Sequence, residues 1–230
     1  MFVDDVAKGY NDNVFTSEMD AYFISVNVQT NVDGRQEIEN ITDICSKIRN
    51  CNKTAYIWIR STITPSTFRL LDERFHVNYM PEFLSENTAI DDFARIPIVY
   101  TPSDRTDELE LLCRIFNGRE GMETTSIEAI HAKYFHNIFG ALKVTYFNCI
   151  YDMCLRHSLD FDTVKKAMMV PGHISELYTK VPGPDGKLGY GGKCFPKDTI
   201  AFINDNRGSI LNSLIDNMPK INESLRNEND

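Results

Sequence analysis

One stretch of the sequence, Ser126 to Arg156, constrains the fold of this chain more than any other feature. It holds no proline and a single glycine, Gly140, and its apolar residues recur at helical spacing over about thirty residues. A helix of that length is unusual in a globular domain, and such helices commonly run between domains or along a subunit interface. We therefore predict one long helix that is too apolar to be covered by so small a chain, and a homodimer packed along it.

The first half of the chain alternates strand and helix signals. Short β-rich apolar runs, typical of strands, occupy residues 21–28, 55–59, 76–79 and 96–100. Apolar residues at helical spacing predict helices at residues 37–49, 66–75 and 104–116. Strands separated by helices of this size are typical of β-α-β units, so this half is predicted to form a parallel sheet of an α/β fold.

The second half is predicted to be helical apart from one loop. After the long helix, a short helix is expected at residues 160–169 with Asp160 or Asp162 as its cap. A loop rich in glycine and proline follows at residues 181–192. Further helices are expected at residues 197–204 and 209–226.

Composition and charge argue against several classes of function. The chain of 230 residues has a formal net charge of -9 and no basic patch, which argues against nucleic-acid binding. No apolar run is long enough for a membrane span, and the N-terminus carries no targeting signal. The six cysteines include no C-x-x-C pair and the five histidines show no metal-ligand spacing. We expect reduced thiols, no metal site and a cytoplasmic location. The Asn222-Glu-Ser triplet fits the glycosylation pattern, but matches so short are common by chance.

A ten-residue segment from Gly189 to Asp198 carries the clearest chemistry. Its glycines allow close approach of the backbone to a ligand, and Pro196 is typical of the first turn of a helix. Cys194 would then lie just ahead of that helix, where the N-terminal dipole and Lys197 favour a thiolate. Asp198 could act as a base if the first turn folds back towards the cysteine. The alternative is a glycine-rich turn with a small structural cysteine and a capping aspartate.

The same segment resembles a family motif. GYGGKCFPKD is similar to the cysteine-nucleophile motif of the UDP-glucose/GDP-mannose dehydrogenases, a nucleotide-sugar 6-dehydrogenase family. Three further segments match that family in the same order and at similar intervals. They are Ser61-Thr62-Ile63 after a strand, PEFLSE at residues 81–86, and the Lys133…Asn137 pair on the long helix. The resemblance covers roughly residues 2–226.

The resemblance implies a fold and a reaction. The fold is an incomplete Rossmann-like parallel sheet, residues 1–120, followed by an all-helical central domain for dimerisation and catalysis, residues 121–230. The reaction is a two-step oxidation of the sugar C6 alcohol of UDP-glucose or a related sugar nucleotide. NAD takes one hydride to give an aldehyde, the cysteine adds to it, and a second hydride transfer leaves a thioester that water hydrolyses to the uronate.

Catalytic roles carry over by motif to six residues. Cys194 is the nucleophile, and Asp198 helps to activate water. Lys133 and Asn137 stabilise the oxygen on which negative charge develops, and their spacing independently puts them on one helix face. Without the resemblance, that pair would equally fit a solvated helix surface. Thr62 and Glu82 hold a water or act in proton transfer.

The resemblance also assigns residues that bind the substrate. The Tyr190 ring either packs against the sugar or base, or folds onto the core of the protein. The substrate-binding residues implied by the family are Glu82, Phe83, Leu84, Glu86, Lys187, Tyr190, Gly191 and Lys197.

The departures from the family pattern cluster on the cofactor side. No G-x-G-x-x-G turn precedes Asp20, and such a turn normally holds the pyrophosphate of a dinucleotide on backbone N–H groups. The N-terminal MFVDD aligns with the family's second strand, whose terminal acid, here Asp4 or Asp5, would bind ribose. We expect NAD to bind weakly or not at all. The residues left for it by resemblance are Asp4, Val28, Thr30, Ser61, Thr62 and Glu86.

Three interpretations of the chain remain open at this stage. It resembles a short form of the family, without the glycine-rich turn and without the second nucleotide-binding domain of larger relatives. It is an enzyme or the catalytic part of one, or a non-catalytic relative that serves as a dimeric scaffold. The third possibility is a sugar-nucleotide binding module without redox chemistry.

Overall fold

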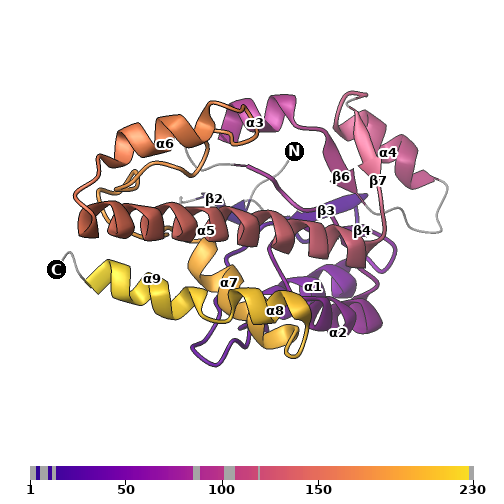
Figure 1. Cartoon of the computed structure of the whole chain (residues 1–230). Helices are drawn as coiled ribbons and strands as arrows, with labels where there is room; N and C mark the ends of the chain where they lie inside the picture. The colour runs from indigo at the N-terminus through magenta and orange to yellow at the C-terminus, as the bar shows by residue number, and fades with distance from the viewer. Residues whose placement is uncertain are drawn as a thin grey trace. The chain divides into compact units, whose positions relative to one another are not determined.

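The computed structural model describes residues 4–5, 10–11, 14–84, 89–100, 107–118 and 120–227. The chain divides into two compact units: Met1–Gln29 with Gln36–Lys133, and Thr30–Arg35 with Tyr134–Asp230. The division falls inside the long helix α5 (Ser126–Arg156), which is drawn as one continuous ribbon in Figure 1. The sequence pattern changes from alternating strands and helices to helices alone earlier in the chain, near residue 120. This change reflects secondary structure, whereas the division at Lys133 reflects which residues pack together.

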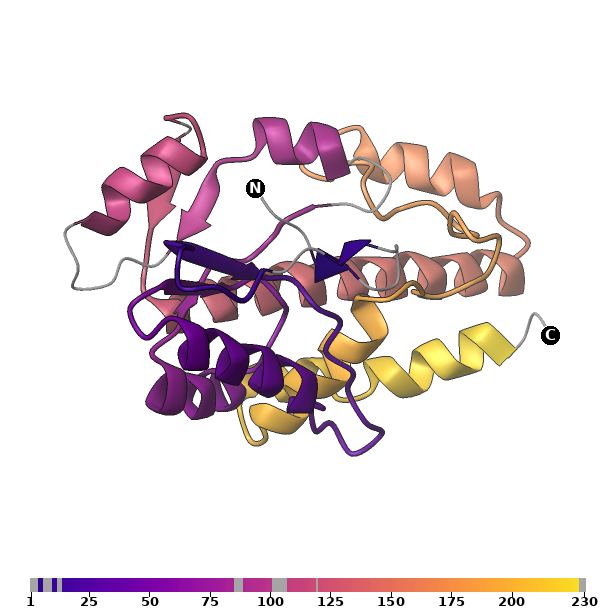
Figure 2. The ribbon, with the colours of Figure 1, turned by 180° about the vertical axis from the view of Figure 1, so that it is seen from behind.

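A three-stranded parallel sheet forms the centre of the first unit. Its strands are β3 (Ala21–Ile24), β4 (Tyr56–Ile59) and β5 (Asn78–Tyr79), in the order β3-β4-β5. All four residues of β4 are buried, as expected for a central parallel strand. The connecting helices α1 (Glu39–Cys51) and α2 (Pro65–Phe75) lie side by side in Figure 2. These elements confirm the predicted β-α-β organisation.

Two details of the predicted sheet are wrong. Strand β6 (Ile98–Tyr100) was expected to complete the same sheet, but it pairs in parallel with β7 (Gly121–Glu123), which the sequence did not predict. Among the described residues, β1 (Asp4–Asp5) pairs only with β2 (Tyr10–Asn11), and this pairing is antiparallel rather than part of the parallel sheet. Strands of two or three residues carry almost no periodicity, so their partners are set by tertiary packing.

Aromatic packing joins these pieces into one core. The Trp58 ring stacks against Phe23 and Tyr56, with ring centroids 5.0 and 5.2 Å apart. Its indole N–H donates to the buried Glu108 carboxylate at 3.1 Å. Tyr100 of β6 packs in the same cluster as Trp58. The helices nearby are α3 (Ala89–Arg95), which was not predicted, and α4 (Asp107–Ile115).

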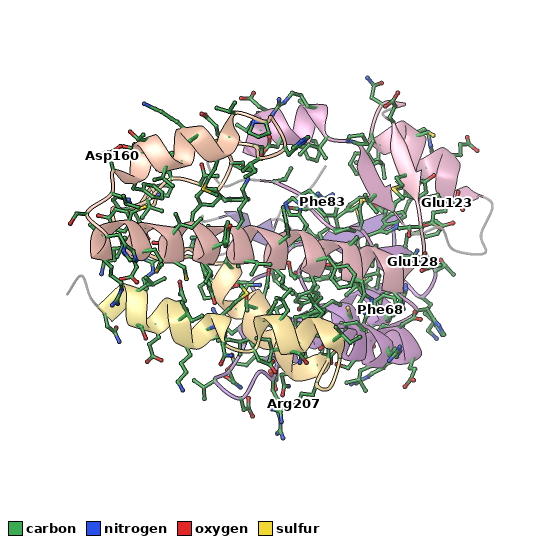
Figure 3. All side chains as sticks on the ribbon, viewed as in Figure 1. Phe68, Phe83, Glu123, Glu128, Asp160 and Arg207 are labelled. Carbon is green, nitrogen blue, oxygen red and sulfur yellow. The ribbon has the colours of Figure 1, made fainter. Side chains whose placement is uncertain are left out.

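The start of α5 follows from a capping box. The backbone N–H of Glu128 donates to the Thr125 hydroxyl at 3.3 Å, and the Thr125 N–H donates to the Glu128 carboxylate at 3.0 Å. The Thr125 hydroxyl also donates to the Glu128 carboxylate, at 2.7 Å, and this hydrogen bond is the main reason that the pKa of Glu128 is lowered. Figure 3 labels Glu128 at this end of the helix. The predicted bounds of the long helix, Ser126 to Arg156, are confirmed.

Four shorter helices complete the second unit. Helix α6 (Phe161–Met169) is capped by Asp160, which accepts from the Thr163 N–H at 2.6 Å, so Asp160 rather than Asp162 is the cap. Phe161 packs with Phe147 and Cys154 of α5. In Figure 1, α6 and α9 run along opposite sides of α5. The last three helices are α7 (Phe195–Asp205), α8 (Ile210–Ile215) and α9 (Met218–Asn227). The sequence predicted a single helix over residues 209–226, where the structure has both α8 and α9.

The single glycine of α5 lies where α7 begins. A Cβ atom at Gly140 would come within 2.6 Å of the Phe195 ring and 3.2 Å of the Tyr178 ring. These two rings pack edge to face, with centroids 5.3 Å apart. Gly140 therefore lets the first residue of α7 pack directly against the backbone of α5.

Candidate functional site

The first group of candidate residues comprises Arg60, Glu82, Phe83 and Lys133, all in the first unit. Glu82 lies just after β5, and Arg60 ends β4, so neighbouring strand ends bring them together. The Arg60 Nε donates to Glu82 Oε1 at 2.5 Å, and the two side chains are 11% and 30% exposed. This ion pair fixes the position of the Glu82 carboxylate.

Lys133 reaches the same loop from α5. Its ammonium donates to the main-chain oxygen of Glu82 at 2.5 Å and lies 5.5 Å from the centre of the Phe83 ring. Phe83 is labelled in Figure 3. Lys133 is only 8% exposed, so it does not lie on a solvated helix surface. Glu82 is thus bound at its side chain by one cation and at its backbone by another.

The candidate residues on the cofactor side make structural contacts. The Ser61 hydroxyl donates to the Val26 carbonyl at 2.7 Å and accepts from the Val26 N–H at 2.9 Å. The Gln36 amide donates to the main-chain oxygen of Thr62 at 3.1 Å. Val28 is buried, with 3% exposure. In the second unit, the buried Thr30 hydroxyl has no hydrogen-bond partner among the described residues.

Two other predicted residues cannot be placed in full. Glu86 lies outside the described residues. Asp4 belongs to β1, but its side chain is also outside what the structure describes. Leu84, at the end of the described loop, is half-buried.

The second group comprises Asn137, Cys194, Lys197 and Asp198, all in the second unit. Asp198 is fully buried, and its two carboxylate oxygens accept from two donors. The Asn137 amide donates to Oδ2 at 2.7 Å, and the Lys197 ammonium donates to Oδ1 at 2.6 Å. Asn137 is 5% exposed, so this position on α5 is also buried rather than solvated.

Cys194 is the residue immediately before α7. Its thiol is exposed, and its carbonyl accepts the Asp198 N–H at 2.9 Å, which closes the first turn of the helix. Pro196 lies in that first turn, as predicted. The segment from Gly189 to Asp198 thus ends in a helix start with an exposed sulfur and a buried carboxylate one turn later.

The other cysteines differ from Cys194 in their surroundings. Burial raises the pKa of the Cys45 thiol to about 12, and desolvation also raises the pKa of Cys149. Cys154 is buried, and the Cys51 thiol donates to the Ile48 carbonyl at 3.2 Å. Cys113 and Cys149 are exposed, like Cys194. All six cysteines lie in the described part of the chain and none forms a disulfide.

The glycine-rich loop, residues 181–192, contains three of the predicted substrate-binding residues. Lys187 is exposed, Gly191 is half-buried and Tyr190 is 3% exposed. Burial raises the pKa of Tyr190 to about 12. The Tyr190 ring is therefore folded onto the core of the protein, which is one of the two positions that the sequence left open.

The fold is that of a Rossmann-like dehydrogenase. A solved UDP-glucose dehydrogenase from the archaeon Pyrobaculum islandicum is similar, with a TM-score of 0.72 and 25% identity, covering 91% of this chain and 50% of that protein. A UDP-D-ManNAc dehydrogenase from Pyrococcus horikoshii shares the fold, with a TM-score of 0.74 at 16% identity, covering 91% of this chain and 51% of that protein.

Two family models match consecutive parts of the sequence. The NAD binding domain of the UDP-glucose/GDP-mannose dehydrogenase family matches residues 9–118, and the central domain of the same family matches residues 127–224. The chain therefore belongs to the UDP-glucose/GDP-mannose dehydrogenase family.

Curated relatives agree with this assignment. A UDP-glucose 6-dehydrogenase from Rickettsia bellii is 28% identical over 221 residues, which cover 90% of this chain and 47% of that protein. The UDP-glucose 6-dehydrogenase YwqF from Bacillus subtilis is 30% identical over 201 residues, which cover 81% and 44%. The chain thus spans about half the length of the curated relatives that it matches.

Sequence reasoning missed Arg60, Asn148, Asn222 and Arg226, which contact the predicted site segments. Arg60 directly follows a fully apolar strand, and a charged residue at such a strand end was the one available signal. Asn222 and Arg226 are four residues apart and so share one face of the last helix. The sequence had drawn attention to Asn222 only through the glycosylation pattern.

Proposed function

We propose that this chain is the cysteine-bearing part of a nucleotide-sugar 6-dehydrogenase, with UDP-glucose or a related sugar nucleotide as its substrate. One observation carries the proposal: Cys194 is exposed at the start of α7, with a buried Asp198 held by two donors in the same turn. A merely structural cysteine would commonly be buried. The names of the relatives supply the substrate class.

The chemistry of this group is nucleophilic addition. The Cys194 thiolate attacks the aldehyde carbon at C6 of the sugar, so a carbon–sulfur bond forms and the carbonyl π electrons move to oxygen. The family resemblance assigns Lys133 and Asn137 to the stabilisation of that oxygen. The Asp198 carboxylate is held in position, because its two oxygens accept hydrogen bonds from Asn137 and Lys197. This fixed carboxylate, one turn after Cys194, supports the role of base for the hydrolytic water that the resemblance assigns to Asp198.

The described residues do not fit NAD by themselves. The turn before α2 is closed by Thr64, whose hydroxyl accepts the Thr67 N–H, and Pro65 has no N–H to offer. The turn before α1 carries Glu37 and Glu39, whose carboxylates repel a pyrophosphate. In neither turn is there a glycine-rich segment of the kind that holds dinucleotide phosphates. We therefore assign no hydride-transfer step to these residues.

A second function, sugar-nucleotide binding without redox chemistry, is favoured by this uneven pattern. The hydroxyl of Ser61 donates to and accepts from the backbone of Val26, whereas the Cys194 thiol is exposed. Drift after a complete loss of function would be expected to change both sides of the site. The two functions differ in whether NAD is ever bound, which the NAD titration below decides.

The proposed function predicts that Cys194 is the most reactive of the six cysteines. Brief alkylation with iodoacetamide at neutral pH, followed by peptide mapping, should find Cys194 modified first, because its sulfur is exposed at the N-terminus of α7. Cys113, another exposed thiol, is the internal control. Earlier modification of Cys113 or Cys149 would remove the physical support for the nucleophile.

Binding of the sugar nucleotide tests the same proposal directly. UDP-glucose titrated into the chain should give saturable heat, and a matched titration with glucose alone should give none. Absence of UDP-glucose binding by a folded chain would contradict the proposed function, whatever the reactivity of Cys194.

We also propose a homodimer along α5. The helix presents exposed apolar side chains at alternating spacings of four and three residues, the pattern of a coiled-coil seam. Phe139 is 66% exposed, Tyr146 is 54% exposed and Met153 is 53% exposed. The full stripe consists of Phe135, Phe139, Leu142, Tyr146, Cys149 and Met153, of which Leu142 is half-buried and the others are exposed.

The substitution Phe139→Glu is expected to dissociate this dimer. A charge buried at the centre of the stripe should weaken association at least about tenfold, because an unpaired charge is costly in an interface. Sedimentation velocity at micromolar protein should show a monomer. Leu155→Glu, exposed on the same helix but off the stripe, is the matched control and should remain dimeric. A wild-type monomer at micromolar concentration would contradict the dimer.

In the described part of the chain, no helix is long and apolar enough to span a membrane. Free thiols at all six cysteines fit the cytoplasmic location that we propose.

A further inference from the structure

In the glycine-rich loop, a single side chain binds both the backbone N–H and the backbone carbonyl of Tyr190. The Tyr190 N–H donates to Asn222 Oδ1 at 2.6 Å, and the Asn222 Nδ2 donates to the Tyr190 carbonyl at 3.0 Å. The amide of Asn222 thus takes the place that a neighbouring strand would have in a sheet. Asn222 lies on α9, thirty-two positions from Tyr190.

A second residue of α9 strengthens this attachment. The Arg226 Nε donates to the Tyr190 carbonyl at 3.2 Å, and its Nη1 donates to Asp185 Oδ2 at 2.7 Å. The hydrogen bond from Arg226 is the main reason that the pKa of Asp185 is lowered, so this ion pair persists in mildly acidic solution. From α5, Asn148 Oδ1 accepts the Gly189 N–H at 2.9 Å.

The glycines of the loop are explained by these contacts. Gly189 has a φ of 72°, in the left-handed region, and a Cβ there would collide with the Asn222 amide. A Cβ at Gly191 would collide with the Arg226 guanidinium. The loop can therefore lie against Asn222 and Arg226, which we call the α9 clamp, only because glycine occupies both positions.

We propose that Asn222 and Arg226 are positioning residues that fix the course of the glycine-rich loop and, through it, the place of Cys194 at the start of α7. Only three residues, Gly191, Gly192 and Lys193, separate the clamped Tyr190 from the cysteine. The chain is too short there to absorb a shift of the loop without moving the residue before α7. This proposal rests on the proposed function for its catalytic meaning, but its structural content does not depend on it.

Hydrogen exchange of the loop tests the clamp itself. In Asn222→Ala, exchange in a peptide covering residues 183–193 is expected to be about tenfold faster, because Tyr190 loses the acceptor for its N–H. Amides of α6, which the clamp does not touch, should exchange as in the wild type. Asn227→Ala, the same substitution at an exposed position on the same helix, is the matched control and should change nothing. Unchanged exchange of residues 183–193 in a folded Asn222→Ala chain overturns the proposal.

The reactivity of Cys194 tests the consequence. Freed from the clamp, the residues before α7 no longer hold Cys194 in one position at the start of the helix, so alkylation of Cys194 at neutral pH should slow by about two- to fivefold. Alkylation of Cys113 in the same sample should keep its rate, which a general loss of stability would change. Asn222→Asp, which keeps the acceptor for Tyr190 N–H but loses the donor, should give intermediate values. If Asn222→Ala does not fold, hydrogen exchange of residues 183–193 and alkylation of Cys194 are measured in Asn222→Asp and Arg226→Gln instead.

The outcomes separate this proposal from the proposed function. Faster loop exchange with slower Cys194 alkylation supports the clamp even if the wild-type chain binds no UDP-glucose, and that result contradicts only the proposed function. An unchanged Cys194 rate despite faster loop exchange overturns the positioning role.

Discussion

Titrated with NAD in a calorimeter, this 230-residue chain is expected to show a dissociation constant in the millimolar range or weaker. A pyrophosphate is normally held by backbone N–H groups of a glycine-rich turn at a helix N-terminus. The turns before α1 and α2 do not offer such groups, because Thr64 and Pro65 close the turn before α2 and the turn before α1 carries two glutamates. Losing two charge-assisted hydrogen bonds of roughly 1.5–3 kcal/mol each weakens binding by about two to four powers of ten.

UDP-glucose is the control ligand for this titration, and it should bind more tightly than NAD. When the chain is mixed with NAD and UDP-glucose, it should oxidise little or none of the UDP-glucose at ordinary NAD concentrations. Micromolar NAD binding would contradict the prediction. It would mean either that the N-terminal segment provides a phosphate site or that a second subunit does.

Replacement of the buried carboxylate, Asp198→Ala, should lower the free energy of unfolding by about 3–5 kcal/mol. Asp198 is fully buried, and its removal leaves the Asn137 amide and the Lys197 ammonium without their acceptor. Urea denaturation followed by circular dichroism measures the change.

Two companion variants sharpen this measurement. Asp198→Asn keeps an acceptor oxygen and the side-chain shape, so it should cost less than the alanine. Asp216→Ala removes an exposed carboxylate at the end of α8 and should change stability by less than about 0.5 kcal/mol. A loss below about 1 kcal/mol for Asp198→Ala would show that the buried ion pair is not needed for folding.

The elements predicted most accurately are those whose signals are local. Both ends of α5 follow from the sequence, since Thr125 and Glu128 form a capping box and the stretch holds no proline. Asp160 caps α6 for the same kind of reason. These signals lie within a few residues of the structure that they determine.

The elements that escaped prediction depend on distant partners. Strand β7 has only three residues, all exposed, and its pairing with β6 crosses more than twenty positions of sequence. The antiparallel pairing of β1 with β2 was also missed, since an alignment to a family's strand says nothing about a local hairpin. Strand pairing at this length is decided by the surrounding core.

The candidate site shows the same division. Lys133, Asn137, Cys194 and Asp198 lie in short motifs, and the sequence was enough to select them. The ion pair of Arg60 with Glu82 joins residues twenty-two positions apart, and no spacing rule predicts it. The burial of Tyr190 could not be chosen over contact with a ligand until the contacts of α9 were known.

Gly140 has a consequence for protein engineering. A glycine inside a long helix costs roughly 1 kcal/mol relative to alanine, so Gly140→Ala would rank high in any search for stabilising substitutions. Here the gain in helix propensity would be offset, because the added methyl group would enter the space of the Phe195 ring. Phe195 adjoins Cys194, so a displaced Phe195 ring would also disturb the residue that carries the thiol. The position is better left unchanged when the chain is used as a scaffold.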